Sequence, residues 1–221
     1  MLVHSIKVRP FEKEDRQAVR NICFMTGYMG EPADIYWSDI ESFADMWCGY
    51  YTDMEPESCF VAEIDGEVVG YSLGCFDSKN AWNPAMIGMK HAFNRGLMFT
   101  KGTGPAMWRT LSDVLSDLIS KRRLPQKPFL DPRWPSHMHI DILEQGRRMG
   151  MGRELVESIK QRFISLGSPG LHLETVLENQ NAVKFFRSVG FKDYGEPLEL
   201  PGIRAKDGSR LHGHVMVMDL K

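Results

Sequence analysis

The segment from residue 59 to residue 76 constrains the fold more than any other part of the sequence. It contains two apolar, strand-prone runs, 59–64 and 67–76, that are separated only by the pair Asp65-Gly66. An Asp-Gly pair accepts the left-handed backbone of a tight two-residue turn, so the segment predicts an antiparallel hairpin. The rest of the chain must therefore be arranged around a sheet that contains this hairpin.

The hydrophobic periodicity on either side of the hairpin alternates between that of strands and that of helices. Strands are predicted at 5–8, 59–64, 67–76, 138–143, 171–176, 191–194 and 214–220, and helices at 14–25, 40–51, 150–166 and 179–189. The pattern indicates an α/β (α+β) chain with a mixed central sheet of about six to seven strands flanked by helices.

Residues 77–135 differ from their surroundings because they are rich in glycine and proline. They contain one predicted helix, at about 107–120, a turn at Lys101-Gly-Thr-Gly104, and the proline-broken run LPQKPFLDPRWP. We interpret this segment as an insertion before the fourth strand, so residues 1–221 are expected to form a single domain.

The overall charge and hydropathy exclude several classes of partner. The net charge is -2, which provides no general attraction to nucleic acid or to an anionic membrane, so neither is expected as a partner. The N-terminus has no apolar signal core, and no run approaches the roughly 18 apolar residues of a membrane span. The four cysteines form no C-x-x-C pair, and these features together predict a cytoplasmic protein.

Charge is unevenly distributed along the chain. Residues 90–133 contain nine Lys or Arg against three Asp, whereas residues 21–78 contain no Lys or Arg. The twelve acids of that second stretch are Glu31, Asp34, Asp39, Glu41, Asp45, Asp53, Glu55, Glu57, Glu63, Asp65, Glu67 and Asp77. Ordinary solvated surface explains this pattern, and so does a protein that binds a cationic substrate on one side and an anionic cofactor on the other.

A glycine-containing loop, Glu144-Gln-Gly-Arg-Arg-Met-Gly-Met-Gly152, connects a predicted strand to a predicted helix. The free amides at a helix start bind phosphate groups, and glycines let a pyrophosphate approach the backbone. The loop is neither a Walker A loop nor a G-x-G-x-x-G fingerprint. A phosphorylated cofactor and a plain tight turn both remain open on this evidence.

Two ordered motifs resemble those of the GNAT superfamily of acetyl-CoA-dependent N-acetyltransferases. Arg147-Arg-Met-Gly150-Met-Gly152 is similar to R-x-x-G-x-G, and residues 179–191, NQNAVKFFRSVGF, are similar to N-x-x-A-x-x-F-Y-x-x-x-G-F. The opening RPFEKEDRQAVRNIC, the insertion and HMHIDIL also resemble bacterial acetyltransferases related to the C-terminal acetyltransferase-like domain of O-GlcNAc hydrolases. The resemblance implies a GNAT fold and acetyl-CoA as the cofactor.

The same resemblance implies how the cofactor is held. The backbone of Ile142 and Leu143 is expected to pair with the pantetheine arm, in a gap where the fourth and fifth strands splay apart. Asn179 is expected near the pantetheine or the acetyl end. Pyrophosphate contacts are expected from the backbone amides of Arg148, Met149, Gly150, Met151, Gly152 and Arg153, with added charge from Arg147, Arg148 and Arg153.

Phe186 departs from the family pattern. Many relatives have a tyrosine at this position that protonates the leaving thiolate, and phenylalanine has no proton to donate. Ser188 and Tyr194 are candidate substitutes, and the departure also leaves open a catalytically weak protein that only binds acetyl-CoA.

The strand at residues 138–143 offers candidates for the general base that must deprotonate an attacking amine. Strand periodicity places His137, His139 and Asp141 on one face, and histidine titrates near neutral pH. The His-Met-His run resembles the paired histidines of arylalkylamine acetyltransferases. Glu174 is a further candidate base, and packed histidines without a catalytic role are the alternative.

The sequence therefore predicts an acetyl-CoA-dependent N-acetyltransferase that acts on a small-molecule or peptide primary amine by direct attack in a ternary complex. The acids between residues 21 and 78 lie among aromatics that suit an ammonium ion, so a cationic acceptor is expected; these aromatics are Tyr28, Tyr36, Trp37, Trp47, Tyr50 and Tyr51. A metal-dependent hydrolase is the competing hypothesis, with ligands from His137, His139, Asp141, His212 and His214. A homodimer is left open.

Overall fold

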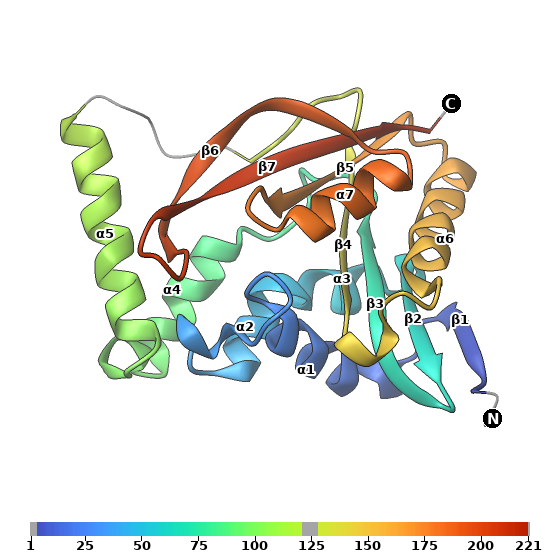
Figure 1. The fold of residues 1–221 in the computed structure, drawn as a ribbon, viewed down its shortest axis with the longest axis horizontal. Coiled ribbons are helices and arrows are strands. Elements are labelled where there is room, and N and C mark those ends of the chain that lie inside the picture. Colours follow the sequence, from blue (N-terminus) through green and yellow to red (C-terminus); the bar gives the residue numbers. More distant parts are fainter. Residues whose placement is uncertain (1–3, 121–127, 221) are drawn as a thin grey trace.

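A computed structural model describes residues 4–120 and 128–220, so Lys121, Arg122, Arg123 and Lys127 of the basic stretch lie outside the described residues. Within the described ranges the chain forms one seven-stranded sheet in the order β1-β2-β3-β4-β5-β7-β6 (Figure 1). The strands are β1 Ile6–Pro10, β2 Cys59–Ile64, β3 Glu67–Cys75, β4 Ser136–Ile142, β5 Gly170–Val176, β6 Lys192–Arg204 and β7 Arg210–Asp219. The predicted mixed α/β architecture is confirmed.

The predicted hairpin is the β2-β3 pair. Asp65 and Gly66 have φ angles of 53° and 86°, which is the left-handed backbone that a two-residue turn of this kind requires. All neighbouring strands are antiparallel except β4 and β5, which are parallel and pair only at Ser136 with Leu171 and His137 with His172. Beyond these two pairs, β4 and β5 separate.

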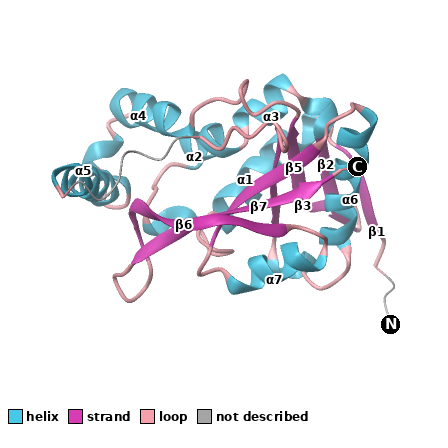
Figure 2. Cartoon of the chain, turned by 90° about the horizontal axis from the view of Figure 1, so that it is seen from above, coloured by secondary structure: helices cyan, strands magenta, loops and turns pink. Residues whose placement is uncertain are grey.

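Helices cover both faces of the sheet. They are α1 Arg16–Thr26, α2 Ile40–Trp47, α3 Gly49–Met54, α4 Pro84–Asn94, α5 Thr103–Ile119, α6 Met151–Ser165 and α7 Gln180–Ser188. Figure 2 shows α7 on one side of the strands and α1 and α3 on the other. Because side chains alternate along a strand, Met138 and Ile140 of β4 pack with α6 and α7, whereas His137, His139 and Asp141 face α1 to α3.

Three predicted elements differ in the structure. The helix predicted at 40–51 is two helices, because the backbone departs from helical geometry at Cys48, which has φ -119°. The strand predicted at 191–194 continues to Arg204, and β7 begins at Arg210. Pro197 and Pro201 interrupt the sequence pattern of β6, and the strand accommodates them with register shifts against β7.

The segment between β3 and β4 contains two long helices rather than one. The prediction missed α4, because its large apolar residues do not form a single buried stripe: Met86, Met89 and Phe93 are exposed. Of the predicted turn at Lys101-Gly-Thr-Gly104, Lys101 and Gly102 do form a turn, whereas Thr103 and Gly104 belong to the first turn of α5. No helix of the described residues combines the length and the apolar character needed to cross a bilayer.

Asp113 connects α5 to β6 and β7, which extend from the sheet toward this helix (Figure 1). Its carboxylate accepts hydrogen bonds from the backbone N–H of Gly202 at 2.8 Å, from Arg204 at 2.7 Å and from Arg210 at 3.0 Å. Asp113 is 7% exposed, and these contacts, led by Arg204, lower its pKa to about 2. A buried carboxylate with three charged or polar donors should contribute more to stability than a surface ion pair.

We expect Asp113→Asn to lower the free energy of unfolding at pH 7 by about 2 to 3 kcal/mol, the scale of a carboxyl pKa near 2 in the folded state and near 4 when unfolded. A lowered pKa stabilises the fold fully above the unfolded value, and this contribution disappears as the pH falls from about 4 to 2. Urea unfolding at several pH values measures it. Asp117→Asn, which removes a more exposed contact to Arg210, is the control and should cost less than about 1 kcal/mol. Equal losses in both variants would contradict this role of Asp113.

Candidate functional site

The separation of β4 and β5 opens a cleft of about 170 Å³ through the sheet. The lining residues come from four segments: Thr26, Gly27, Met29 and Gly30 at the end of α1 and just after it; Met138, His139, Ile140 and Asp141 of β4; Leu173, Glu174, Thr175 and Val176 of β5; and Asn179, Ala182 and Phe186 at the start of α7 and within it. The cleft therefore joins the α7 side of the sheet to the α1 side. A ligand held on one side can meet a ligand held on the other.

On the α7 side, the loop before α6 leaves a row of backbone amides free. No amide from Arg148 to Gly152 donates a hydrogen bond within the described part of the chain, whereas the amide of Arg153, also expected to be free, donates to the carbonyl of Gly150 at 3.0 Å. Arg148 and Gly150 have φ angles of 63° and 85°, a left-handed backbone that turns the loop tightly before the helix start. A Cβ built on Gly150 meets no atom within 4 Å, so there is open space beside this part of the loop. The loop has the donors and the room that a phosphate group needs.

The predicted loop residues do not all serve the same purpose. The Met151 side chain is buried at 1% exposure in the core beneath α6. A Cβ on Gly152 would lie 3.0 Å from the Phe185 ring and 3.3 Å from Ile142, so this glycine permits close packing of α6. Met151 and Gly152 can therefore offer only their backbone amides to a ligand.

The three arginines that were predicted to add positive charge to the loop differ in their hydrogen bonds. Arg147 donates from Nε to the carbonyl of Ile142 at 3.0 Å and from Nη2 to the carbonyl of Gly30 at 3.1 Å. Arg153 donates to the carbonyl of Ser188 at 3.3 Å. Arg148 and Met149 are exposed beside the free amides. Arg147 thus links the two loops that border the cleft, and Arg148 is the better placed of the three for an anion.

The edge of β4 corrects one part of the expected cofactor contact. The N–H of Leu143 donates to the carbonyl of Val69 in β3 at 2.9 Å, so the backbone of Leu143 faces the wrong neighbour to pair with a ligand in the gap. Backbone groups alternate in direction along a strand, so those of Ile142 and Ile140 point toward β5, where no strand pairs with them beyond His137. Ile140, which the sequence did not single out, presents its backbone to the gap, whereas Leu143 does not.

Asn179, at the start of α7, and Phe186 of α7 both line the cleft. The Asn179 side chain accepts the N–H of Ala182 at 3.2 Å and so caps the helix. The two suggested substitutes for the missing tyrosine are outside the cleft: Ser188 donates to the carbonyl of Phe185, and Tyr194 contacts Asp131 and Arg133. Thr175 is the hydroxyl that lines the cleft from β5, and it was not predicted.

On the α1 side, a buried tyrosine connects the predicted acid-base residues. The Tyr71 hydroxyl donates to Asp141 at 2.7 Å and lies 3.3 Å from Nδ1 of His139. Since its proton is directed to Asp141, the hydroxyl can only accept from the imidazole, which places the His139 proton on Nδ1. Nε2 of His139 then carries the lone pair, 3.6 Å from the Asp141 carboxylate.

The surroundings adjust the pKa of both groups. Burial lowers the pKa of His139, but contacts with Cys48 and the charge of Asp141 outweigh it, and the net pKa is raised. Burial raises the pKa of Asp141, partly opposed by His139 and Tyr71. An imidazole with a raised pKa and a neighbouring carboxylate can accept a proton and hold it as an imidazolium.

His137 is separated from this pair, although it shares a face of β4 with it. It lies where β4 and β5 still pair, and it does not line the cleft. Its Nδ1 is 2.8 Å from the Tyr51 hydroxyl, and burial beside His172 lowers its pKa well below the usual range. The structure therefore does not support a direct role for His137 as a base. Glu174 does line the cleft, and burial raises its pKa.

The hypothesis of a metal-dependent hydrolase is not supported by the placement of its proposed ligands. His212 lies 2.7 Å from Glu178, and His214 lies 2.7 Å from Asp193. In β7, His212 and His214 point to the same face of the sheet as Met216, which packs in the core with α7. His139 points to the other face, toward α1, so the two sets of proposed ligands lie on opposite sides of the sheet. Within residues 4–120 and 128–220, no group of three or more His, Cys, Asp or Glu is arranged to hold a metal ion.

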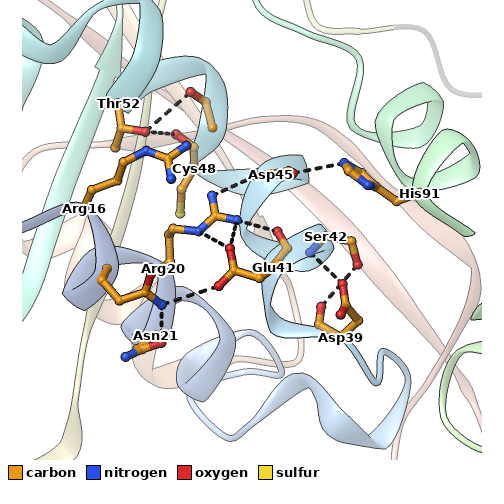
Figure 3. A network of polar contacts seen from close by, with 12 residues as sticks. Arg16, Arg20, Asn21, Asp39, Glu41, Ser42, Asp45, Cys48, Thr52 and His91 are labelled. Atoms are coloured by element: carbon orange, nitrogen blue, oxygen red, sulfur yellow. Dashed lines mark hydrogen bonds and ion pairs between the residues drawn. The ribbon is translucent and has the colours of Figure 1, made fainter. Parts of the chain in front are cut away.

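The acids of residues 21–78 are compensated by ion pairs from other parts of the chain. Figure 3 shows Arg20, which is 2% exposed, between Glu41 and Asp45, and His91 beside Asp45. Eight of the twelve acids pair in this way: Glu31, Asp39, Glu41, Asp45, Asp53, Glu57, Glu63 and Asp65. Most of the twelve acids are therefore paired with basic side chains and do not form an unpaired acidic surface. Four of the six aromatics, Tyr28, Trp37, Tyr50 and Tyr51, are buried in the core.

Comparisons with known proteins agree with the geometry. Residues 136–207, from β4 into the β6-β7 turn, match the family model of the acetyltransferase (GNAT) domain. Among solved structures, the protein called SsHAT is similar with a TM-score of 0.64 and 22% identity, over 98% of this chain and 99% of its own.

Two further solved structures that are similar to the chain are acetyltransferases with a stated cofactor or product. The acetyltransferase yncA from Salmonella typhimurium, solved with its cofactor acetyl-CoA, gives a TM-score of 0.57 at 14% identity, over 98% of this chain and 94% of its own. The polyamine N-acetyltransferase of Drosophila melanogaster, which forms N-acetylagmatine, gives a TM-score of 0.57 at 16% identity, over 97% of this chain and 100% of its own. The fold of the chain is thus the GNAT fold, and residues 136–207 are similar to the GNAT acetyltransferase domain.

Proposed function

We propose that the chain transfers the acetyl group of acetyl-CoA to a primary amine by direct attack within a ternary complex. The observation that carries this proposal is the cleft between β4 and β5. His139 lines it on the α1 side, and the loop with the free amides follows β4, the strand that forms one wall of the cleft. Such a cleft lets a cofactor and an acceptor enter from opposite faces of the sheet and meet at its centre.

The residues of the α7 side fit acetyl-CoA, which supplies an activated acetyl thioester when bound. The amides from Arg148 to Gly152 would bind the pyrophosphate with the positive end of the α6 dipole behind them, assisted by the Arg148 guanidinium. The backbone groups of Ile140 and Ile142 would bind the amides of the pantetheine arm as a neighbouring strand does. Asn179 and Phe186 would lie next to the acetyl end of the cofactor, because both line the cleft.

On the α1 side, His139 would act as the general base. Its Nε2 accepts the proton that an ammonium group must lose before the nitrogen can attack. Asp141 stabilises the imidazolium that results, and Tyr71 fixes the ring and its tautomer through Nδ1. In place of the family tyrosine, we assign Thr175 a hydrogen bond to the leaving sulfur, because it lines the cleft on the same side of the sheet as Phe186.

The acceptor that fits this cleft is a cationic amine on a small molecule or a peptide. The attraction cannot come from the acids of residues 21–78, most of which are paired. Asp141 and Glu174 are instead the two carboxyl groups that line the cleft, and both lie toward α1, where an acceptor would enter. Because Asp141 is half-buried and Glu174 is exposed, the specificity constant for a cationic acceptor should fall as added salt screens their attraction.

An acetylation screen tests this proposal. The purified chain with acetyl-CoA should release free thiol with diamines or lysine peptides, and more slowly with neutral amines of similar size. Glu174→Gln should reduce the preference for diamines over neutral amines, whereas Glu67→Gln, at the exposed start of β3, should not. Binding of acetyl-CoA without thiol release from any amine would instead favour the protein that only binds the cofactor.

Two further expectations belong to this proposal. The narrower resemblance to acetyltransferases related to the C-terminal domain of O-GlcNAc hydrolases rests on the N-terminal segment, the insertion and HMHIDIL. The cytoplasmic location is supported by Cys23, Cys48, Cys59 and Cys75, which are all buried free thiols of the kind a reducing compartment maintains.

A further inference from the structure

Exposed apolar side chains are concentrated on the segment between β3 and β4. Of the 21 large apolar residues that are exposed in the described parts of the chain, 11 lie within residues 77–135. They are Trp82, Met86, Met89, Phe93, Phe99, Trp108, Leu111, Leu115, Leu118, Ile119 and Leu130. A concentration of this kind on one segment indicates an interaction surface rather than scattered surface leucines.

The helix α5 organises the most regular part of this surface. One face of α5 packs on β6, and Ala106, Thr110 and Asp113 contact or bond to the strand region around Gly202 and Arg204. The opposite face presents Trp108, Leu111, Leu115 and Leu118, which are spaced by three, four and three residues. That spacing makes a straight apolar stripe, typical of a seam between two helices. No described residue covers this stripe, since its four side chains are 45% to 61% exposed.

We propose that this stripe is the centre of a homodimer in which the α5 helices of two copies pack antiparallel about a two-fold axis. The spacing reads the same in both directions, so an antiparallel copy places Trp108 opposite Leu118 and Leu111 opposite Leu115. Every member of the stripe thus meets a large apolar side chain of the same stripe. A surface that complements itself in this way fits a second copy of the chain, as an isologous interface requires.

The chemistry beside the stripe permits the same arrangement. Ser112 and Val114 flank its centre without charge, and Asp113 and Asp117 point to the opposite face, where they bind arginines of β6 and β7. Like charges therefore do not meet across the two-fold axis. Antiparallel packing also brings opposite ends of the two helix dipoles together.

The size of the stripe sets the strength of the expected dimer. With about 100 Å² of exposed area on each of its side chains and a contribution from Phe99, the two copies would bury on the order of 1,000 Å² in total. This value is close to the lower limit for a specific interface, so we expect a reversible dimer with a Kd on the order of micromolar. Phe99 is 92% exposed in the short helix Leu97–Phe99, which packs against α5.

Sedimentation equilibrium of the full chain tests the interface, and three variants define its register. The wild type should be dimeric at about 100 µM and dissociate near 1 µM. Leu111→Glu/Leu115→Glu should be monomeric throughout this range, because four like charges meet at the axis. Leu111→Glu/Leu115→Lys should recover the dimer at low salt, since only antiparallel packing places opposite charges face to face. Ser116→Glu, on the same helix but off the stripe, should dimerise like the wild type.

Thermal unfolding of each variant monitors the fold, which these half-exposed positions should not disturb. A wild type that is monomeric at about 100 µM overturns the proposal, and so does a dimer that survives Leu111→Glu/Leu115→Glu. Failure of the Glu/Lys pair to recover the dimer rejects the antiparallel register. Sedimentation of a monomeric wild type with vesicles of phosphatidylcholine and phosphatidylserine would assign the face to a membrane surface instead.

Discussion

Replacing His139 with alanine should lower kcat by about 100-fold or more, the usual scale of general base catalysis, while the affinity for acetyl-CoA stays within about two-fold of the wild type. The reason is the position of the side chain: Nε2 carries the lone pair beside Asp141 on the α1 side of the cleft, away from the loop that would bind the cofactor. Steady-state rates of thiol release and acetyl-CoA titrations measure the two quantities separately.

The pH dependence makes this prediction more specific. In the wild type, kcat/KM should fall as the pH drops through the raised pKa of His139, because the imidazolium cannot accept a proton. Tyr71→Phe removes the hydroxyl that orients the ring and should lower kcat by about ten-fold, with a shifted acid limb. Added imidazole should partly restore His139→Ala.

His137→Asn is the matched control on the same strand and face, and its effect on kcat should be below about five-fold, because His137 does not line the cleft. A larger loss in His137→Asn than in His139→Ala would exchange the roles of the two histidines. An unchanged pH profile in His139→Ala would move the base to Glu174.

Replacing Gly150 with valine should abolish the stabilisation of the protein by acetyl-CoA. Gly150 has a φ of 85° at the start of α6, beside the free amides, and a branched side chain there both strains the backbone and covers the donors. For the wild type, acetyl-CoA at about 100 times its Kd should stabilise the fold by about 2.7 kcal/mol, which corresponds to a rise in Tm of about 5 °C or more. Thermal unfolding with and without acetyl-CoA measures the rise.

Gly208→Val is a closely matched control. Gly208 has a φ of 87° in the turn between β6 and β7, and a Cβ there also meets no atom within 4 Å. The two variants should lose similar stability in the absence of ligand, but Gly208→Val should retain the full rise in Tm. If Gly150→Val keeps the rise, the loop does not hold the pyrophosphate. If the wild type shows no rise at millimolar acetyl-CoA, the proposed cofactor is wrong.

The sequence by itself determined the features that depend on neighbouring residues. Asp65-Gly66 specified a tight turn because both positions need a left-handed backbone, and the structure has that turn. Alternation along β4 correctly placed His137, His139 and Asp141 on one face, since successive side chains of a strand point to opposite sides. The loop before α6 was likewise visible in the order of its glycines and the helix that follows.

Only the tertiary structure decided which of these residues share a site. His137 and His139 are equivalent in strand periodicity, but β5 still pairs with β4 at His137 and has separated by His139, so only the latter reaches the cleft. Tyr71 contacts His139 across 68 residues of sequence, and Arg20 neutralises acids more than 20 residues away. Local patterns cannot report such contacts, because pairing between strands and packing between helices bring together residues whose distance along the chain carries no signal.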